Sequence, residues 1–257
     1  MEQGTKEWLE WRRQGIGASE SAALLQVCPY KTPFQLYQEK LGAQGGDDDQ
    51  AELFRMGHEA EAELRAAYEF ETGLDFPPAL FEHPEFPFIR ASLDGWCADA
   101  TGDVPKGLEC KLVGHDKFHS PIPEHHIVQV QHQMLVTATD SWAYLRKNKL
   151  TGERKVEIIQ ANKVVQSNIL GACWQFWDQV QKRIPPAYTE RDWVPDTSTA
   201  LVRALAAMRD AKTTKERQKF RADVLGLVRH KRTVCHGVKI SLEPDRITFP
   251  KEEGNAG

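Results

Sequence analysis

Apolar positions recur every three or four residues in several stretches of the chain, a spacing that places them on one face of a helix. This spacing predicts helices over 7–13, 20–26, 33–41, 49–72, 129–137 and 165–180. Ser19 is the expected N-cap of the second helix, and Pro33 takes the first position of the third. Gly42 and Gly73 follow the third and fourth helices as stop signals, and the polar stretch 43–49 is expected to be a loop.

Short, mostly apolar runs between turn residues predict strands over 88–93, 95–98, 108–112, 141–146 and 155–159. After residue 186 the composition changes. Helical spacing returns around Leu205 and Val224, and two last apolar runs, 238–242 and 246–249, fit a β-hairpin. We therefore predict three parts: a core, a C-terminal helical extension packed on the core, and a disordered tail. Their predicted bounds are 1–194, 195–250 and 251–257.

Composition places the chain among ordinary globular proteins. The 257 residues are 40% hydrophobic and 27% charged. The sequence contains no run of eighteen apolar residues and begins without an apolar segment, so neither a membrane span nor a signal peptide is expected, and cytoplasmic residence is predicted. The five cysteines are scattered without a C-x-x-C pair, which argues against a zinc site, a disulfide framework or an iron–sulfur cluster.

The distribution of charge along the chain is more informative about nucleic-acid binding than the net charge. The net charge of −4 does not suit a protein that coats nucleic acid nonspecifically. Residues 47–71 are strongly acidic, however, whereas the segments 146–155 and 212–232 are basic. Most such runs are solvated faces, and they give only weak support for a nucleic-acid groove.

Three charged residues stand out among the predicted strands. Asp94 ends one strand, and Glu109 and Lys111 lie two positions apart on the next, so that both point to the same face. Leu108 and Leu112 flank them, and charged side chains are rarely buried without a partner. A surface β-hairpin with a salt bridge explains the bare pattern. A functional site in which Asp94 reaches the other two is the alternative.

Phosphodiester hydrolysis is the chemistry that this set of residues favours. Mg²⁺ prefers carboxylate, carbonyl and water oxygens, so Asp94, Glu109 and the backbone carbonyl of Cys110 are candidate ligands. The metal activates a water and neutralises the leaving oxygen, while Lys111 orients that water and stabilises the transition state. The spacing D-x(14)-E-x-K matches the PD-(D/E)xK nuclease signature, with Leu93 in place of the usual proline.

Six motifs appear in order over roughly residues 8–180. They are W-R-R-Q-G-I-G-A-S-E at 11–20, P-Y-K-T-P at 29–33, G-x-x-x-E at 57–61, R-A-S-L-D-G at 90–95, L-E-C-K at 108–111 and I-P-E followed by Q-V-Q-H-Q-M across 122–134. Together they closely resemble the phage lambda-type exonucleases, also called YqaJ-like viral recombinases, of the PD-(D/E)xK nuclease superfamily.

The resemblance implies an α/β fold with a restriction-endonuclease-like core, in which helices flank a central mixed sheet. A C-terminal helical hairpin and a possible β-hairpin would follow. It also implies 5′→3′ degradation of one strand of linear double-stranded DNA, which leaves 3′ tails for phage-type recombination. Two Mg²⁺ ions per active site are expected, with Mn²⁺ as a substitute. Expected partners are DNA ends, two further copies in a homotrimeric ring, and a phage single-strand annealing protein in the bacterial host cytoplasm.

The resemblance also implies roles for individual residues at the positions that match the family motifs. The catalytic set that the resemblance implies is Asp94, Glu109, Lys111, Gln129 and Glu61. Arg12, Ser19 and Ser92 match positions that contact DNA, the first two at a pocket for the 5′-phosphate. A glycine-rich turn before a helix, with an arginine nearby, is a plausible anion site, although simple capping and a surface arginine explain the same residues.

Two other functions remain open on this sequence. One is a structure-specific or restriction-type endonuclease, which the 5′-phosphate pocket disfavours. The other is a catalytically inactive module that binds DNA ends, which the presence of all three core residues disfavours. Leu53, Phe54 and Met56 are candidates for an apolar wedge that separates strands.

Overall fold

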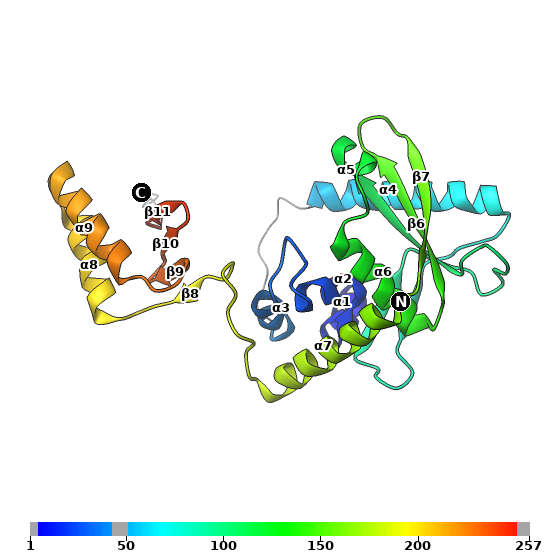
Figure 1. Ribbon diagram of the computed structural model, residues 1–257, viewed down its shortest axis with the longest axis horizontal. Helices are drawn as coiled ribbons and strands as arrows, with labels where there is room; N and C mark the ends of the chain where they lie inside the picture. Colours follow the sequence, from blue (N-terminus) through cyan, green and yellow to red (C-terminus); the bar gives the residue numbers. More distant parts are fainter. Residues whose placement is uncertain (1–4, 43–50, 251–257) are drawn as a thin grey trace. The chain divides into compact units, whose positions relative to one another are not determined.

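The computed structural model describes residues 5–42 and 51–250, with side chains from residue 56 onward in the second range (Figure 1). The chain forms two compact units, residues 1–186 and 187–257. The division falls eight residues before the predicted boundary at 194. The predicted loop 43–49 and tail 251–257 lie outside the described residues, and no helix within the described ranges is long and apolar enough to cross a membrane.

The N-terminal unit opens with α1 (Lys6–Arg13), α2 (Ala18–Leu24) and α3 (Pro33–Lys40). Thr32 caps α3 in a capping box, and Pro33 takes its first position as predicted. The predicted cap of α2 is wrong. The helix begins two positions earlier than predicted with Gly17 as N-cap, because the Glu20 carboxylate accepts the Gly17 N–H at 2.8 Å, and Ser19 lies inside the first turn.

Seven strands of this unit form two mixed sheets. The strands are β1 (Ile16–Gly17), β2 (Ala79–Glu82), β3 (Ile89–Leu93), β4 (Gly95–Trp96), β5 (Gly107–Val113), β6 (Ser141–Asn148) and β7 (Arg154–Gln160). One sheet has the order β1-β3-β2 and the other β4-β5-β6-β7. The β1–β3 and β5–β6 pairs are parallel and the rest antiparallel. Asp94 therefore lies where the chain passes from one sheet to the other.

Helices cover both faces of the four-stranded sheet, as predicted. The long α4 (Ala51–Thr72) packs on β5, and Leu64 and Tyr68 of α4 share a buried cluster with Leu145 of β6. Gly73 ends this helix at φ +70°, where glycine is favoured. On the other face lie α6 (Glu124–Thr137) and α7 (Lys163–Lys182), and α5 (His115–His119) follows β5.

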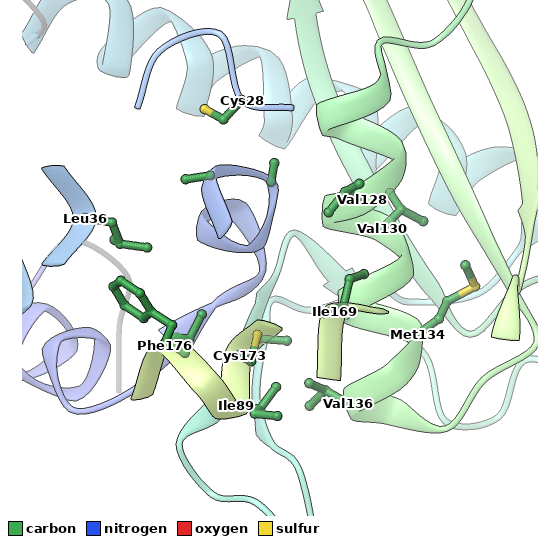
Figure 2. Packing of buried hydrophobic residues seen from close by; sticks show 14 of the residues in the cluster. Cys28, Leu36, Ile89, Val128, Val130, Met134, Val136, Ile169, Cys173 and Phe176 are labelled. Atoms are coloured by element: carbon green, nitrogen blue, oxygen red, sulfur yellow. The ribbon is translucent and has the colours of Figure 1, made fainter. Parts of the chain in front are cut away.

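The larger core lies between α2, α6, α7 and the inner strands. Figure 2 shows Met134 and Val136 of α6 in this cluster with Ile169 and Cys173 of α7. Trp142 and Tyr144 of β6 belong to it, whereas Ala143 and Leu145 face the α4 side. This alternation fixes which residues of the neighbouring β5 turn toward α6.

The C-terminal unit has a separate core. It consists of β8 (Val194–Pro195), α8 (Thr199–Asp210), α9 (Thr214–Leu227), β9 (Arg232–Cys235), β10 (Val238–Leu242) and β11 (Asp245–Thr248). The predicted helical hairpin and β-hairpin are both present, and β8 and β9 extend the hairpin to a sheet of order β11-β10-β9-β8. Leu205 and Val224 are buried in the core as the helical spacing predicts.

Candidate active site

Asp94 occupies the bend between β3 and β4. Its Oδ2 accepts the backbone N–H of Cys110 at 2.7 Å, which ties the bend to the middle of β5. From α4, Arg65 donates to the Asp94 carbonyl at 2.7 Å and to Glu61 Oε1 at 3.2 Å. Arg65, about one helical turn after Glu61, thus links Glu61 to Asp94, although these two acidic residues are 33 positions apart in the sequence.

Glu109 lies at the centre of β5 on the α6 side. Only 1% of its surface is exposed. One carboxylate oxygen accepts from Lys111 Nζ and from Gln129 Nε2 at 2.6 Å, and the other accepts from Gln133 Nε2 at 2.6 Å. The predicted shared face of Glu109 and Lys111 is present in the structure, and α6 supplies two amides that fix the orientation of the carboxylate.

Cys110 points the opposite way, into the cluster beneath α4, as strand alternation predicts. Burial and three neighbouring carboxylates, led by Asp94, raise the pKa of its thiol, so the side chain is neutral. Its backbone faces the site, because the Cys110 N–H is the donor to Asp94.

The carboxylates of the site are poorly compensated. Burial, followed by the negative charges of Glu109 and Glu61, raises the pKa of Asp94 well above its usual value. Lys111 is the neighbouring cation: burial opposes its charge, but Glu109 and Asp94 outweigh this effect and raise its pKa. Lys111 is therefore protonated and acts as a hydrogen-bond donor, while Asp94 lacks a cation of its own.

Arg12 and Ser19 lie at the junction of α1 and α2, Arg12 near the end of the first helix and Ser19 near the start of the second. Arg12 Nη2 is 3.3 Å from Ser19 Oγ and 3.5 Å from Glu20 Oε1, and its guanidinium stacks over the Trp8 ring at 4.8 Å. Ser19 is exposed. The Gly17 N–H, part of the turn predicted to bind an anion, already donates to Glu20. The anion-binding groups left at this junction are the Arg12 guanidinium and the Ser19 hydroxyl.

A single cleft of 410 Å³ joins these groups. All of the predicted site residues line it: Arg12, Ser19, Glu61, Ser92, Asp94, Glu109, Cys110, Lys111 and Gln129. Ser92 Oγ is buried and has no hydrogen-bond partner within the described part of the chain, so it is available to a ligand in the cleft. Side chains from α1, α2, α4, α6, the strands β3 and β5 and the bend after β3 therefore converge, although the sequence scatters them over more than a hundred positions.

Several contributors were not predicted as site residues. Gln133 binds Glu109 directly, and its position four residues after Gln129 is the sequence signal that indicates a shared helix face. Arg65 has the same relation to Glu61. Trp8 and Lys149 also line the cleft, but no local pattern marks them. Of the wedge candidates, Met56 lines the cleft, and Leu53 and Phe54 have side chains outside the described part.

The donor set fits a hard divalent cation. Asp94 and Glu109 supply carboxylate oxygens, and their mutual repulsion is the kind that a cation relieves. No three His, Cys, Asp or Glu side chains among the described residues are grouped closely enough to hold a metal by themselves. Mg²⁺ commonly binds through one or two carboxylates with waters and substrate phosphate completing the shell, so two ligands suffice. The five histidines from His115 to His132 contribute no such group.

A solved structure has a fold similar to that of this chain. The crystal structure of an alkaline exonuclease from Laribacter hongkongensis is similar to this one, with a TM-score of 0.55 and 22% sequence identity. The match covers 70% of this chain and 94% of the exonuclease chain. The fold is thus the α/β restriction-endonuclease-like core.

The sequence pattern of the YqaJ-like viral recombinase domain matches residues 7–140, and the chain belongs to that family. The uncharacterized protein YqaJ of Bacillus subtilis is 32% identical over 139 residues, and the uncharacterized protein R354 of Acanthamoeba polyphaga mimivirus is 27% identical over 160. The matched segments span 42% and 29% of those two proteins. The C-terminal unit lies outside the family match.

Proposed function

We propose that the protein is a Mg²⁺-dependent deoxyribonuclease that degrades one strand of linear double-stranded DNA from its 5′ end. The observation that carries the proposal is the common cleft. Its lining combines a carboxylate pair and a lysine with an arginine and an exposed serine. The first group suits a scissile phosphate, and the second suits a terminal phosphate. Membership of a viral recombinase family supports a role in recombination.

Asp94 and Glu109 would hold the metal, and Cys110 would add its backbone carbonyl. When bound, Mg²⁺ supplies Lewis-acid activation of a water and charge neutralisation at the phosphate. Gln129 and Gln133 fix the Glu109 carboxylate, so it does not reorganise during the reaction. Lys111 holds its proton and donates to the attacking water or to a phosphate oxygen. Arg65 orients Glu61 beside Asp94.

Arg12 and Ser19 would bind the 5′-phosphate. The Arg12 guanidinium is held by Trp8 and Glu20 and still reaches Ser19, so the two donors are preorganised for an anion. Such a contact favours ends over internal sites, because an internal phosphodiester carries no terminal dianion. A solved structure of the related alkaline exonuclease holds dAMP, a 5′-mononucleotide, which is the kind of product that end-wise hydrolysis would release.

The direct test uses linear duplexes labelled on either strand, with and without a 5′-phosphate, in Mg²⁺ and in chelator. We expect mononucleotide release from the 5′ ends in Mg²⁺ only, and no cleavage of covalently closed circular plasmid. Cleavage of the plasmid would instead support an endonuclease, and DNA binding without any hydrolysis would support an inactive end-binding module.

Arg12→Gln tests the phosphate pocket, with Arg13→Gln as its matched control. Arg13 is the next residue, is half exposed and pairs with Glu10 instead of facing the cleft. We expect Arg12→Gln to reduce the preference for phosphorylated over unphosphorylated ends about tenfold, equivalent to about 1.4 kcal/mol of lost contact. An unchanged preference would contradict the proposed 5′-phosphate pocket but not the proposed metal site.

The ring-shaped homotrimer and the single-strand annealing partner belong to the same proposal. Mass measurement in solution tests the first. Co-purification with an annealing protein expressed from the same phage-type locus tests the second.

A further inference from the structure

The two units carry opposite charge. Residues 1–186 contain 19 lysines and arginines against 27 acidic residues, a net charge of −8. Residues 187–257 contain 14 against 10, a net charge of +4. The cleft thus lies in the acidic unit, and the attraction for a polyanion is concentrated in the unit that the family match does not cover.

The cations are densest along the helical hairpin and the strand that follows it. Residues 203–232 contain ten lysines and arginines but only three acidic residues. Two of these acidic residues are already engaged: Asp210 pairs with Arg209 at 3.0 Å, and Glu216 accepts from Thr213 in the cap of α9. Lys215 and Arg217 are exposed and form no ion pair within the described part of the chain. This surface has a positive charge that the unit itself does not neutralise.

A hollow of 630 Å³ opens beside these cations. Its lining is apolar at the floor, where Leu205, Val238 and the half-buried Phe249 contribute. Arg209 and Arg217 line it from the two helices of the hairpin. The ion pair of Arg209 with Asp210 is exposed on both sides, so a phosphate can exchange with it. An apolar floor next to two arginines offers stacking and phosphate contacts in one place.

Single-stranded DNA is the ligand whose chemistry matches both features. Its bases are unpaired, so one base can enter an apolar hollow while the flanking phosphates meet arginines. A duplex keeps its bases stacked inside the helix and would use only the charge. An acidic polypeptide would likewise satisfy the arginines but brings no flat apolar group for the floor.

We infer that the C-terminal unit is a second DNA-binding site, which takes single-stranded DNA with a base in the hollow and phosphates on Arg209 and Arg217. The choice of DNA over another nucleic acid rests on the proposed function, whose product is the surviving single strand. This site would retain that strand on the enzyme while the other strand is degraded.

The test measures binding of a labelled oligothymidine to the full-length protein in chelator, where hydrolysis is absent. Arg209→Gln/Arg217→Gln should weaken binding at least tenfold and reduce the slope of log affinity against log salt by about 1.4, because two phosphate contacts are lost. Arg203→Gln/Lys215→Gln is the matched control: it removes the same charge from the same two helices outside the hollow, and binding should change less than threefold. Circular dichroism checks that each variant folds.

Phe249→Leu separates stacking from charge. It keeps an apolar side chain but removes the aromatic ring, and it should weaken binding severalfold without changing the salt slope. The inference is overturned if Arg209→Gln/Arg217→Gln binds like wild type, if the control pair loses as much affinity, or if polyglutamate displaces the oligonucleotide as well as oligothymidine does. Hydrolysis in Mg²⁺ is measured in parallel. Wild-type protein that fails to hydrolyse DNA but shows the expected binding pattern refutes the proposed function and leaves this site standing.

Discussion

Two carboxylates of the N-terminal unit lie in contrasting environments. Glu20 is buried, but Lys40 at 2.7 Å, Arg12 and the Gly17 N–H all offset its charge, and together they outweigh burial and lower its pKa. For Asp94, burial and the negative charges of Glu109 and Glu61 outweigh the effect of Lys111 and raise its pKa. A carboxylate whose charge is balanced holds structure together. One that is left unbalanced indicates that a cation belongs beside it.

The largest expected effect is on catalysis. Glu109→Gln keeps the shape of the side chain and removes the metal-binding charge, so hydrolysis should fall at least about a thousandfold, about 4 kcal/mol in the barrier. Glu63→Gln is the matched control, since Glu63 is 61% exposed and pairs with Lys147. Initial rates on a linear duplex measure the effect. Activity within tenfold of wild type would mean that Glu109 is not part of the chemistry.

Lys111→Met tests the cation of the same site. Removing the ammonium should lower the rate about a hundredfold or more, since the developing charge loses a donor. Lys106→Met, an exposed lysine one position before β5, should behave like wild type in the same assay. A rate for Lys111→Met equal to that of the control would assign Lys111 to folding alone.

The buried ion pair of Glu20 and Lys40 predicts that removing one partner lowers the stability of the protein. Lys40→Met leaves Glu20 without its main partner and should lower the free energy of unfolding by about 3 kcal/mol. Burial lowers the pKa of Lys40 despite Glu20, so the pair itself is not strongly stabilising. The double variant Glu20→Gln/Lys40→Met should therefore recover most of the loss. Urea denaturation in chelator measures all three. Additive losses in the double variant would contradict the pairing.

The repulsion between the Asp94 and Glu109 carboxylates predicts that a bound divalent cation stabilises the folded protein. Mg²⁺ at about a hundred times its dissociation constant should stabilise the folded protein by about 2.7 kcal/mol, seen as a higher melting temperature. Asp94→Asn should abolish most of this increase, while Glu63→Gln should keep it. An equal increase in both variants would place the ion elsewhere.

The smallest effect is the pH dependence without metal. A carboxyl with a raised folded pKa contributes stability below its unfolded value of 3.8, and this stability is lost as the pH rises through the folded value. In chelator, wild type should therefore lose stability relative to Asp94→Asn as the pH rises above 3.8. Parallel melting curves for the two proteins would contradict the raised pKa.

Local patterns predicted most of the fold. The helical spacing and the stop residues Gly42 and Gly73 are local, so α1, α3, α4 and α7 were predicted within a few residues. The strands β1, β2, β8 and β9 were not, because a two- to four-residue strand has no periodicity of its own and exists through its partner. The N-cap of α2 was predicted wrongly for a related reason: the Gly17 N–H donates to the side chain of Glu20, three residues later in the sequence.

The convergence of the site was predicted in part. Strand alternation alone predicts that Glu109 and Lys111 share a face, and the structure has this arrangement. The family motifs point to Arg12, Ser19 and Ser92 as site residues. The contacts of Arg65 with Asp94 and of Gln133 with Glu109 depend on how α4 and α6 pack on the sheets. Long-range packing leaves no mark in a single sequence, so these supporting residues were not identified.

The two faces of α6 have a consequence for how this protein tolerates substitutions. Gln129 and Gln133 donate hydrogen bonds to Glu109, while Val130 and Met134, each the next residue in the sequence, are buried in the core. A methionine or valine replaced by a smaller residue would let the helix rotate or slide toward the void, and the amides would move with it. Under the proposed function, thermal stability and catalytic rate would therefore change together, and repacking that interior would alter the rate without changing any residue that lines the cleft.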